Sequence, residues 1–234
     1  MEESVKRLKL WYFENFNFLK AMTPEEKVRL SSCSVMKKVK KDTSVYLPLD
    51  ASSTIYFLKE GRVKIASYSD DGRELIHAIL RAGQIFGELA LTGEKQRESF
   101  AVATEDALVC QIDIAQFEDI LKSNSRLNLE IVKLIGFRLK RVRNRLERMW
   151  FKSAEDRIKF LLGELCEDYG VETYEGIEIR LHLKHHEIAS LAATARQTAS
   201  SVLSKLEKEG QIAYNRKVIL LKRKAALAWA GMKF

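Results

Sequence analysis

The amino-acid sequence predicts an α+β protein, in which an antiparallel β-barrel or sandwich precedes a long helix and a region of short helices and strands. Three observations predict it. Residues from about 34 to 117 form short β-prone runs separated by turn residues. Apolar residues over 132–149 recur at alternating spacings of three and four. Two amphipathic helical stretches over 184–208 lie between further β-prone runs.

Composition limits the classes of protein to consider. The chain has 234 residues, 46% of them hydrophobic, and a formal net charge of +8, which together indicate one or two globular domains and favour a polyanionic partner. No apolar run reaches transmembrane length, and the amino terminus lacks the apolar core of a signal peptide. Three widely spaced cysteines indicate neither a disulfide framework nor a metal site. We therefore expect a cytoplasmic protein without a membrane partner.

The first helix and the β-region have local signals. Thr23 as N-cap, Pro24 and Glu26 predict a helix that begins with a capping box. His77 lies in an apolar run, and we expect it to be a core histidine rather than a catalyst. The predicted strands are Thr54–Leu58, Arg62–Ser67, Glu74–Leu80, Phe100–Ala103 and Ala107–Ile112.

A glycine-containing turn interrupts this β-region and indicates a ligand site. Gly87 would let the backbone approach a ligand closely, and the following helical turn would offer N–H groups to an anion. Glu88 could accept hydrogen bonds from sugar hydroxyls, and Arg97 could pair with a phosphate. The alternative is that Arg97 is an ordinary surface charge.

The long helix carries two apolar stripes. One follows a heptad seam and predicts pairing with a second copy of the chain, the alternative being burial within one subunit. The other, Leu127, Ile131 and Leu134, can pack on the β-region. Ser153 and Asp156 cap a new helix, which places a hinge at 151–153. The seam residues are Val132, Ile135, Leu139, Val142, Leu146 and Met149.

The last third predicts a winged helix-turn-helix, that is, a strand, two helices and a hairpin. A strand is expected over Ile177–Leu183 and a hairpin over 211–221. Arg196 and Gln197 lie at the start of the second helix, on a surface without apolar residues. Their side chains can form hydrogen bonds with the edges of guanine and adenine, respectively, in a major groove. Residues 184–224 hold nine Lys or Arg against three Glu, as phosphate contact requires. The alternative is a helical hairpin with merely solvated polar residues.

Further DNA contacts are expected around the second helix and on the wing. A hydroxyl of Ser200 or Ser201 would face the DNA together with Arg196 and Gln197. The predicted contacts flanking these two residues are His185, Thr198, Ser201, Lys205, Asn215, Arg216 and Lys217.

In this order of elements the chain resembles the CRP/FNR (catabolite activator and fumarate–nitrate reduction regulator) superfamily over about residues 18–223. The most specific matches are Phe86–Ala90, Tyr56–Val63 and Ala195–Thr198. The resemblance implies a homodimeric transcription regulator that binds a two-fold symmetric operator in double-stranded DNA, with RNA polymerase as a further candidate partner.

The resemblance also implies a division into domains. The expected parts are a cyclic-nucleotide-binding-like β-roll (jelly roll) with amino-terminal helices over 1–125, a dimerisation helix over 126–151, and a winged helix-turn-helix over 152–234.

In cyclic-AMP receptors of this family the residues matching Glu88 and Arg97 bind ribose and phosphate. The chain differs from these receptors at three positions. Glu98 lies beside the phosphate position and would add a negative charge there. Val142 replaces a residue whose hydroxyl faces the adenine in the receptors, and Leu49 replaces a glycine. We therefore expect cyclic AMP to bind weakly or not at all, and another small-molecule effector stays open. The resemblance implies as pocket residues Gly87, Glu88, Leu89, Ala90, Arg97, Glu98, Arg138 and Val142.

Other function classes fit less well. A regulatory or interaction module that responds to cyclic AMP would have no use for residues 177–221. No nucleophile–base pair and no metal-ligand spacing indicates an enzyme. The sequence thus predicts neither catalytic nor metal-binding residues, and it does not identify the effector or the target promoters.

Overall fold

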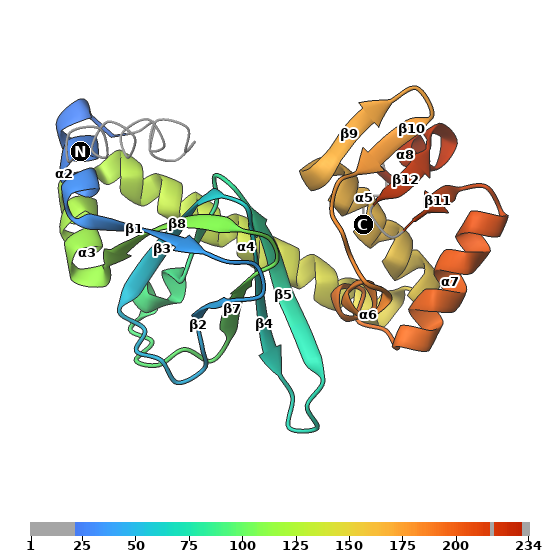
Figure 1. The fold of residues 1–234 in the computed structure, drawn as a ribbon, viewed down its shortest axis with the longest axis horizontal. Coiled ribbons are helices and arrows are strands. Elements are labelled where there is room, and N and C mark those ends of the chain that lie inside the picture. Colours follow the sequence, from blue (N-terminus) through green and yellow to red (C-terminus); the bar gives the residue numbers. More distant parts are fainter. Residues whose placement is uncertain (1–21, 216–217, 231–234) are drawn as a thin grey trace. The chain divides into compact units, whose positions relative to one another are not determined.

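The computed structural model describes residues 22–215 and 218–230 and divides into two compact units, Met1–Arg138 and Leu139–Phe234 (Figure 1). The α+β class predicted from the sequence is confirmed. The elements of the first unit are α2 (Pro24–Ser32), β1 (Ser34–Val39), β2 (Ser44–Tyr46), β3 (Thr54–Glu60), β4 (Arg62–Tyr68), β5 (Glu74–Arg81), β6 (Ile85–Phe86), the 3-10 helix η2 (Glu88–Thr92), β7 (Phe100–Ala103), β8 (Ala107–Asp113), α3 (Ile114–Ser123) and the beginning of α4 (Ser125–Phe151).

Two four-stranded antiparallel sheets, ordered β1-β8-β3-β6 and β2-β7-β4-β5, form the β-roll. Strand β3 is buried on both faces, because it lies between two apolar layers. Tyr56 and Leu58 face the interior of the roll, whereas Ile55 and Phe57 join a second cluster with Phe117 of α3. Helices α2 and α3 and the first turns of α4 cover this second layer, and Leu127 and Ile131 pack there as predicted.

The prediction for His77 is wrong, because its side chain is exposed and its Nε2 lies 2.9 Å from Ser67 Oγ. The pairing of β4 with β5 slips between Ile65 and Ala66, which oppose Ala78 and Ile76. His77 is thus the extra residue of a β-bulge. Ile76 and Leu80 are buried along β5, and the alternation of side chains in a strand places His77 on the outer face.

The predicted helix starts are confirmed. Thr23 Oγ1 accepts the Glu26 N–H at 3.3 Å, and Glu26 Oε2 accepts the Thr23 N–H at 2.8 Å. Ser153 Oγ accepts the Asp156 N–H at 3.1 Å, which starts a new helix directly after α4. Each cap satisfies N–H groups that a helix cannot pair internally.

The second unit contains the end of α4 and the predicted strand, helix pair and hairpin. Its sheet has the order β11-β12-β10-β9. The strand expected over Ile177–Leu183 ends at Ile179, although Leu181 and Leu183 are still buried beyond it. The elements after α4 are α5 (Ala154–Tyr169), β9 (Gly170–Thr173), β10 (Gly176–Ile179), α6 (His185–Leu191), α7 (Arg196–Lys208), β11 (Ile212–Tyr214), β12 (Ile219–Lys222) and α8 (Arg223–Ala230).

None of the helices in the described part of the chain combines the length and the apolar character that crossing a membrane requires.

Candidate nucleic-acid interface and sensor site

Helices α6 and α7 are joined by a turn of four residues, 192–195. Ile188 of α6 and Leu203 and Leu206 of α7 are buried, so the apolar faces predicted from the sequence meet in the core. Ala193 has a φ of 51°, in the left-handed region, where the Cβ atom of a non-glycine residue costs about 1–2 kcal/mol. The Thr194 N–H donates to Ala189 O at 2.9 Å, which closes the turn.

Arg157 of α5 fixes this turn with three hydrogen bonds to carbonyl oxygens. Its Nε donates to Ala192 O and its Nη2 to Ala193 O, both at 3.0 Å, and its Nη1 donates to Lys152 O at 2.9 Å. The guanidinium thus connects the helix-turn-helix to the junction of α4 and α5. Charged donors make strong hydrogen bonds, so the start of α7 is held firmly.

The first turn of α7 is exposed. Arg196, Gln197, Thr198 and Ser201 all lie on the surface, and the N-cap residue Ala195 has no side chain to bind the first N–H groups of the helix. Polar side chains, backbone N–H donors and the positive end of the helix dipole therefore lie together at the start of α7. This combination favours binding of an anionic phosphate backbone.

The structure distinguishes between the two serines considered for DNA contact. Ser200 Oγ donates to Arg196 O at 3.0 Å and lies 2.8 Å from Nδ1 of His185. The hydroxyl of Ser200 is thus engaged, whereas Ser201 is exposed. The His185 ring also contacts Tyr214 of β11, with 5.0 Å between the ring centroids. His185 is therefore a bridge between the helix pair and the hairpin as well as a candidate contact.

The hairpin predicted around Asn215 is present. Asn215 is exposed, and its Oδ1 accepts the Val218 N–H at 2.8 Å. Tyr214 Oη donates to Leu183 O at 2.9 Å, and burial, followed by the Glu187 carboxylate, raises the pKa of Tyr214. The predicted contacts Arg216 and Lys217 lie outside the described residues.

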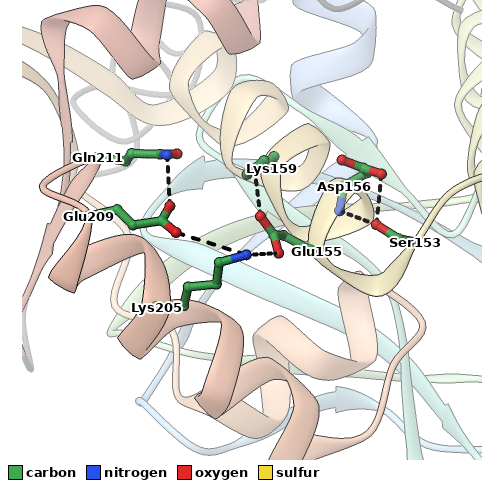
Figure 2. Close-up of polar contacts among 7 residues, drawn as sticks. All are labelled: Ser153, Glu155, Asp156, Lys159, Lys205, Glu209 and Gln211. Carbon is green, nitrogen blue, oxygen red and sulfur yellow. Dashed lines mark hydrogen bonds and ion pairs between the residues drawn. The ribbon is translucent and has the colours of Figure 1, made fainter.

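Lys205 has a partner that the sequence did not predict. Its Nζ lies 2.7 Å from Glu155 Oε2 of α5 and 3.9 Å from Glu209 Oε1 (Figure 2). The hydrogen bond to Glu155 and its charge raise the pKa of Lys205. Two further polar residues, Ser204 and Lys208, are exposed on the same face of α7 as Ser201. The helical spacing of 197, 201, 204 and 208 in the sequence could have revealed them.

In the β-roll, Arg97 lies at the predicted sensor turn, but it is buried and bound by its own chain. Its Nη1 donates to Gly87 O at 3.1 Å and its Nη2 to Thr54 O, and Glu94 lies 3.5 Å away. Arg97 is only 3% exposed, so the alternative of a surface charge is wrong. Gly87 has a φ of 77°, and a Cβ there would lie 2.9 Å from Thr54 O. The close approach that this glycine allows is to the chain itself.

Aromatic rings enclose the same guanidinium. Arg97 Cζ lies 4.8 Å from the ring centroid of Tyr46 and 5.9 Å from that of Tyr56. Tyr56 in turn stacks on Phe86 at 4.9 Å. Burial raises the pKa of both tyrosines, although the nearby Arg97 charge opposes the shift. The aromatic cluster therefore holds the side chain of Arg97 in place by cation–π contact.

Glu88 forms an ion pair with Arg138 of α4, and Arg138 also donates to Ile85 O. Glu98 is exposed, so the expected repulsion beside a phosphate position has no support in this structure. Of the other predicted pocket residues, Leu89 is 54% exposed and Ala90 is buried, and Val142 is exposed on α4. Leu49 has a φ of 71°, which explains why a glycine suits that position.

The predicted seam of α4 is exposed along its whole length. An apolar stripe of this kind on an otherwise charged helix needs a partner. The exposed fractions are 64% for Val132, 41% for Ile135, 68% for Leu139, 56% for Val142, 52% for Leu146 and 48% for Met149. Within residues 22–215 and 218–230, no group of three or more His, Cys, Asp or Glu side chains is placed to hold a metal ion.

Comparison with known proteins supports both parts of this site. Residues 36–124 match the cyclic nucleotide-binding domain family, and residues 156–228 match the Crp-like helix-turn-helix domain family. The chain is 32% identical over 167 residues to the cyclic AMP receptor protein of Thermus thermophilus, covering 70% of this chain and 72% of the relative. It is 29% identical over 196 residues to the global nitrogen regulator of a Nostoc species, covering 83% and 88% of the two chains.

The fold also matches that of solved structures. A structure of a CooA mutant from Carboxydothermus hydrogenoformans superposes with a TM-score of 0.72 at 27% identity, covering 86% of this chain and 89% of the other. A domain of the cyclic nucleotide-binding family, a long helix and a helix-turn-helix thus follow one another in this chain, in an arrangement that superposes on the solved structure. The chain belongs to the CRP/FNR family and is a DNA-binding transcription regulator of that type.

Proposed function

We propose that the protein acts as a homodimer that pairs through the α4 seam and reads a two-fold symmetric operator with two copies of α7. The observation that carries this proposal is the combination of an exposed apolar seam with an exposed polar first turn of α7. Pairing of the seam would bury the apolar side chains, and two-fold symmetry of the protein would require two-fold symmetry of the DNA site. Residues 126–151 serve as the dimerisation helix in this proposal.

Arg196 and Gln197 read base edges, because both are exposed at the start of α7 and both can form bidentate pairs, with guanine and adenine respectively. Thr198, Ser201 and the wing residue Asn215 bind the sugar-phosphate backbone. His185 supports this face through its contacts with Ser200 and Tyr214. Arg157 positions the whole helix pair.

No cyclic nucleotide is needed for DNA binding in this proposal. The two side chains that would hold its ribose and phosphate are engaged elsewhere, Glu88 with Arg138 and Arg97 with Gly87 and Thr54. A nucleotide would have to displace these contacts and then bury its phosphate near the Glu94 carboxylate. The β-roll therefore acts as a structural platform or senses a ligand of different chemistry.

Selection from a pool of random DNA duplexes tests the proposal. The purified protein, without added nucleotide, should enrich duplexes with two inverted half-sites whose centres are about 10–10.5 base pairs apart. Enrichment of a single, asymmetric site would contradict the dimeric arrangement. Failure to enrich any sequence unless cyclic AMP is present would contradict the proposal that DNA binding needs no cyclic nucleotide.

A further inference from the structure

Glu155 lies in the first turn of α5, next to the exposed face of α7 (Figure 2). Its carboxylate binds two lysines, each at 2.7 Å: Lys159 one turn along α5, and Lys205 of α7. Hydrogen bonds from Lys159 and then from Lys205 lower the pKa of Glu155, so the carboxylate is ionised at neutral pH. The sequence predicts a phosphate contact for Lys205 and no role in DNA binding for Glu155.

The group around Lys205 is electrically balanced. Glu155 and Glu209 supply two negative charges, and Lys159 and Lys205 supply two positive charges. Lys205 lies on the same exposed face of α7 as Ser201 and Ser204. An approaching phosphate would thus meet a cation that already has a carboxylate at hydrogen-bond distance. A group without net charge adds nothing to the long-range attraction of a polyanion.

We propose that Glu155 is an affinity-limiting residue of the DNA-binding site, because its carboxylate occupies Lys205 in place of a DNA phosphate. This inference rests on the proposed use of α7 as the reading helix. The chemistry recognised is the same in both states, since a lysine ammonium is a compact point charge that can bind a carboxylate oxygen or a phosphate oxygen. Glu155 thereby lowers binding to all DNA sequences alike and leaves discrimination to Arg196 and Gln197.

The small contribution expected from the Glu155–Lys205 ion pair to stability agrees with such competition. Lys205 keeps 54% of its side chain exposed and Glu155 keeps 26%, and partly exposed ion pairs contribute little to stability. Replacing Glu155 should therefore leave the fold intact. It would also leave one uncompensated positive charge beside the DNA-binding face, free to neutralise a phosphate and release a counterion.

The test is the salt dependence of DNA binding by the full-length protein, measured by fluorescence anisotropy on a selected operator and on an unrelated duplex. Glu155→Gln should raise affinity several-fold at low salt on both duplexes. It should steepen the slope of log K against log salt by about 0.9, the value for one added phosphate contact. In the E155Q background, K205Q should remove this gain. The matched control is Glu175→Gln, which makes the same change of charge in an ion pair with Lys222 that involves no residue of α7.

Three results would overturn the inference. Lower affinity of E155Q would mean that Glu155 positions α7 rather than competing with phosphate. An equal flattening of the slope by K205Q in the wild-type and E155Q backgrounds would mean that Lys205 already contacts phosphate. An equal gain in the Glu175→Gln control would mean a general charge effect. Absence of DNA binding by the wild-type protein would instead contradict the proposed function itself.

Discussion

Arg157 should control the stability of the helix-turn-helix more than any other single cation on α5. Its guanidinium supplies all three of the hydrogen bonds to Lys152 O, Ala192 O and Ala193 O, at 2.9–3.0 Å. Arg157→Met keeps the apolar part of the side chain and removes all three donors. Arg157→Lys keeps the charge, but a single ammonium cannot reproduce the planar fork that reaches adjacent carbonyls.

The expected loss follows from those three contacts. A hydrogen bond from a charged group contributes about 1.5–3 kcal/mol net when buried. Arg157 is half-buried, and water can replace part of each bond, so about 1 kcal/mol per contact is the reasonable scale. We expect Arg157→Met to lower the free energy of unfolding of the second unit by about 2–4 kcal/mol and Arg157→Lys by roughly half as much. A loss of that size lowers Tm by about 10 °C or more in a unit of about 100 residues.

Differential scanning calorimetry of the full-length protein measures this loss, because the two units can unfold in separate transitions. Lys159→Met is the matched control on the same helix. Lys159 forms an ion pair with Glu155 across one helical turn, and such a pair contributes about 0.3–0.5 kcal/mol. Arg157→Met would refute the reasoning if its transition stayed as close to the wild-type temperature as that of the control.

Three further changes have defined outcomes. Leu139→Asp should halve the mass seen by light scattering with little change in subunit stability, since Leu139 is 68% exposed in the single chain but would place a carboxylate in an apolar interface; a dimer of unchanged mass would move the interface off the seam. Burial lowers the pKa of Lys59 to about 7 while the unfolded chain keeps the ordinary pKa of 10.5, so the unfolded state binds more protons above pH 7. The free energy of unfolding should therefore rise between pH 7 and 8.5 by up to about 1.4 kcal/mol per pH unit, and the same rise in Lys59→Met would assign it to other groups. Calorimetric titration with cyclic AMP should show weak binding or none, and a dissociation constant in the low micromolar range would contradict the engagement of Arg97 and Glu88 by their own chain.

The sequence predicted elements best where a local signal determines the structure. The caps at Thr23 and Ser153 act through their own neighbours, and each forms the expected hydrogen bond. Asn215 lies in the predicted hairpin and binds a near neighbour as well, the N–H of Val218. The apolar faces of α6 and α7 follow from helical spacing alone. Helix α3 is not predicted, although Asp113 Oδ1 accepts the Ala115 N–H at 2.9 Å as its N-cap, because the β-prone region expected up to about residue 117 overlaps the first turn of the helix.

Contacts between residues distant in sequence could not be predicted in this way. The pairing of Glu155 with Lys205 joins positions 50 residues apart, and that of Arg62 with Glu105 joins positions 43 apart. The burial of Arg97 depends on the Thr54 carbonyl and on the Tyr46 and Tyr56 rings, which no spacing rule connects to it. The glycine-containing turn lies at Gly87, before the helical turn Glu88–Thr92, as predicted, but what its charged groups bind is a property of tertiary packing.

Reading of bases by α7 is the central claim, and Arg196→Ala tests it most directly. The measurement is a pair of anisotropy titrations at one salt concentration, with the selected operator and with an unrelated duplex. Loss of one bidentate base contact should weaken operator binding by about 1–3 kcal/mol, or roughly 5- to 150-fold. Binding to the unrelated duplex should fall much less, because only the contribution of one positive charge to binding of the phosphate backbone is lost. Equal losses on the two duplexes would show that Arg196 contacts only phosphate and would contradict base readout by this helix.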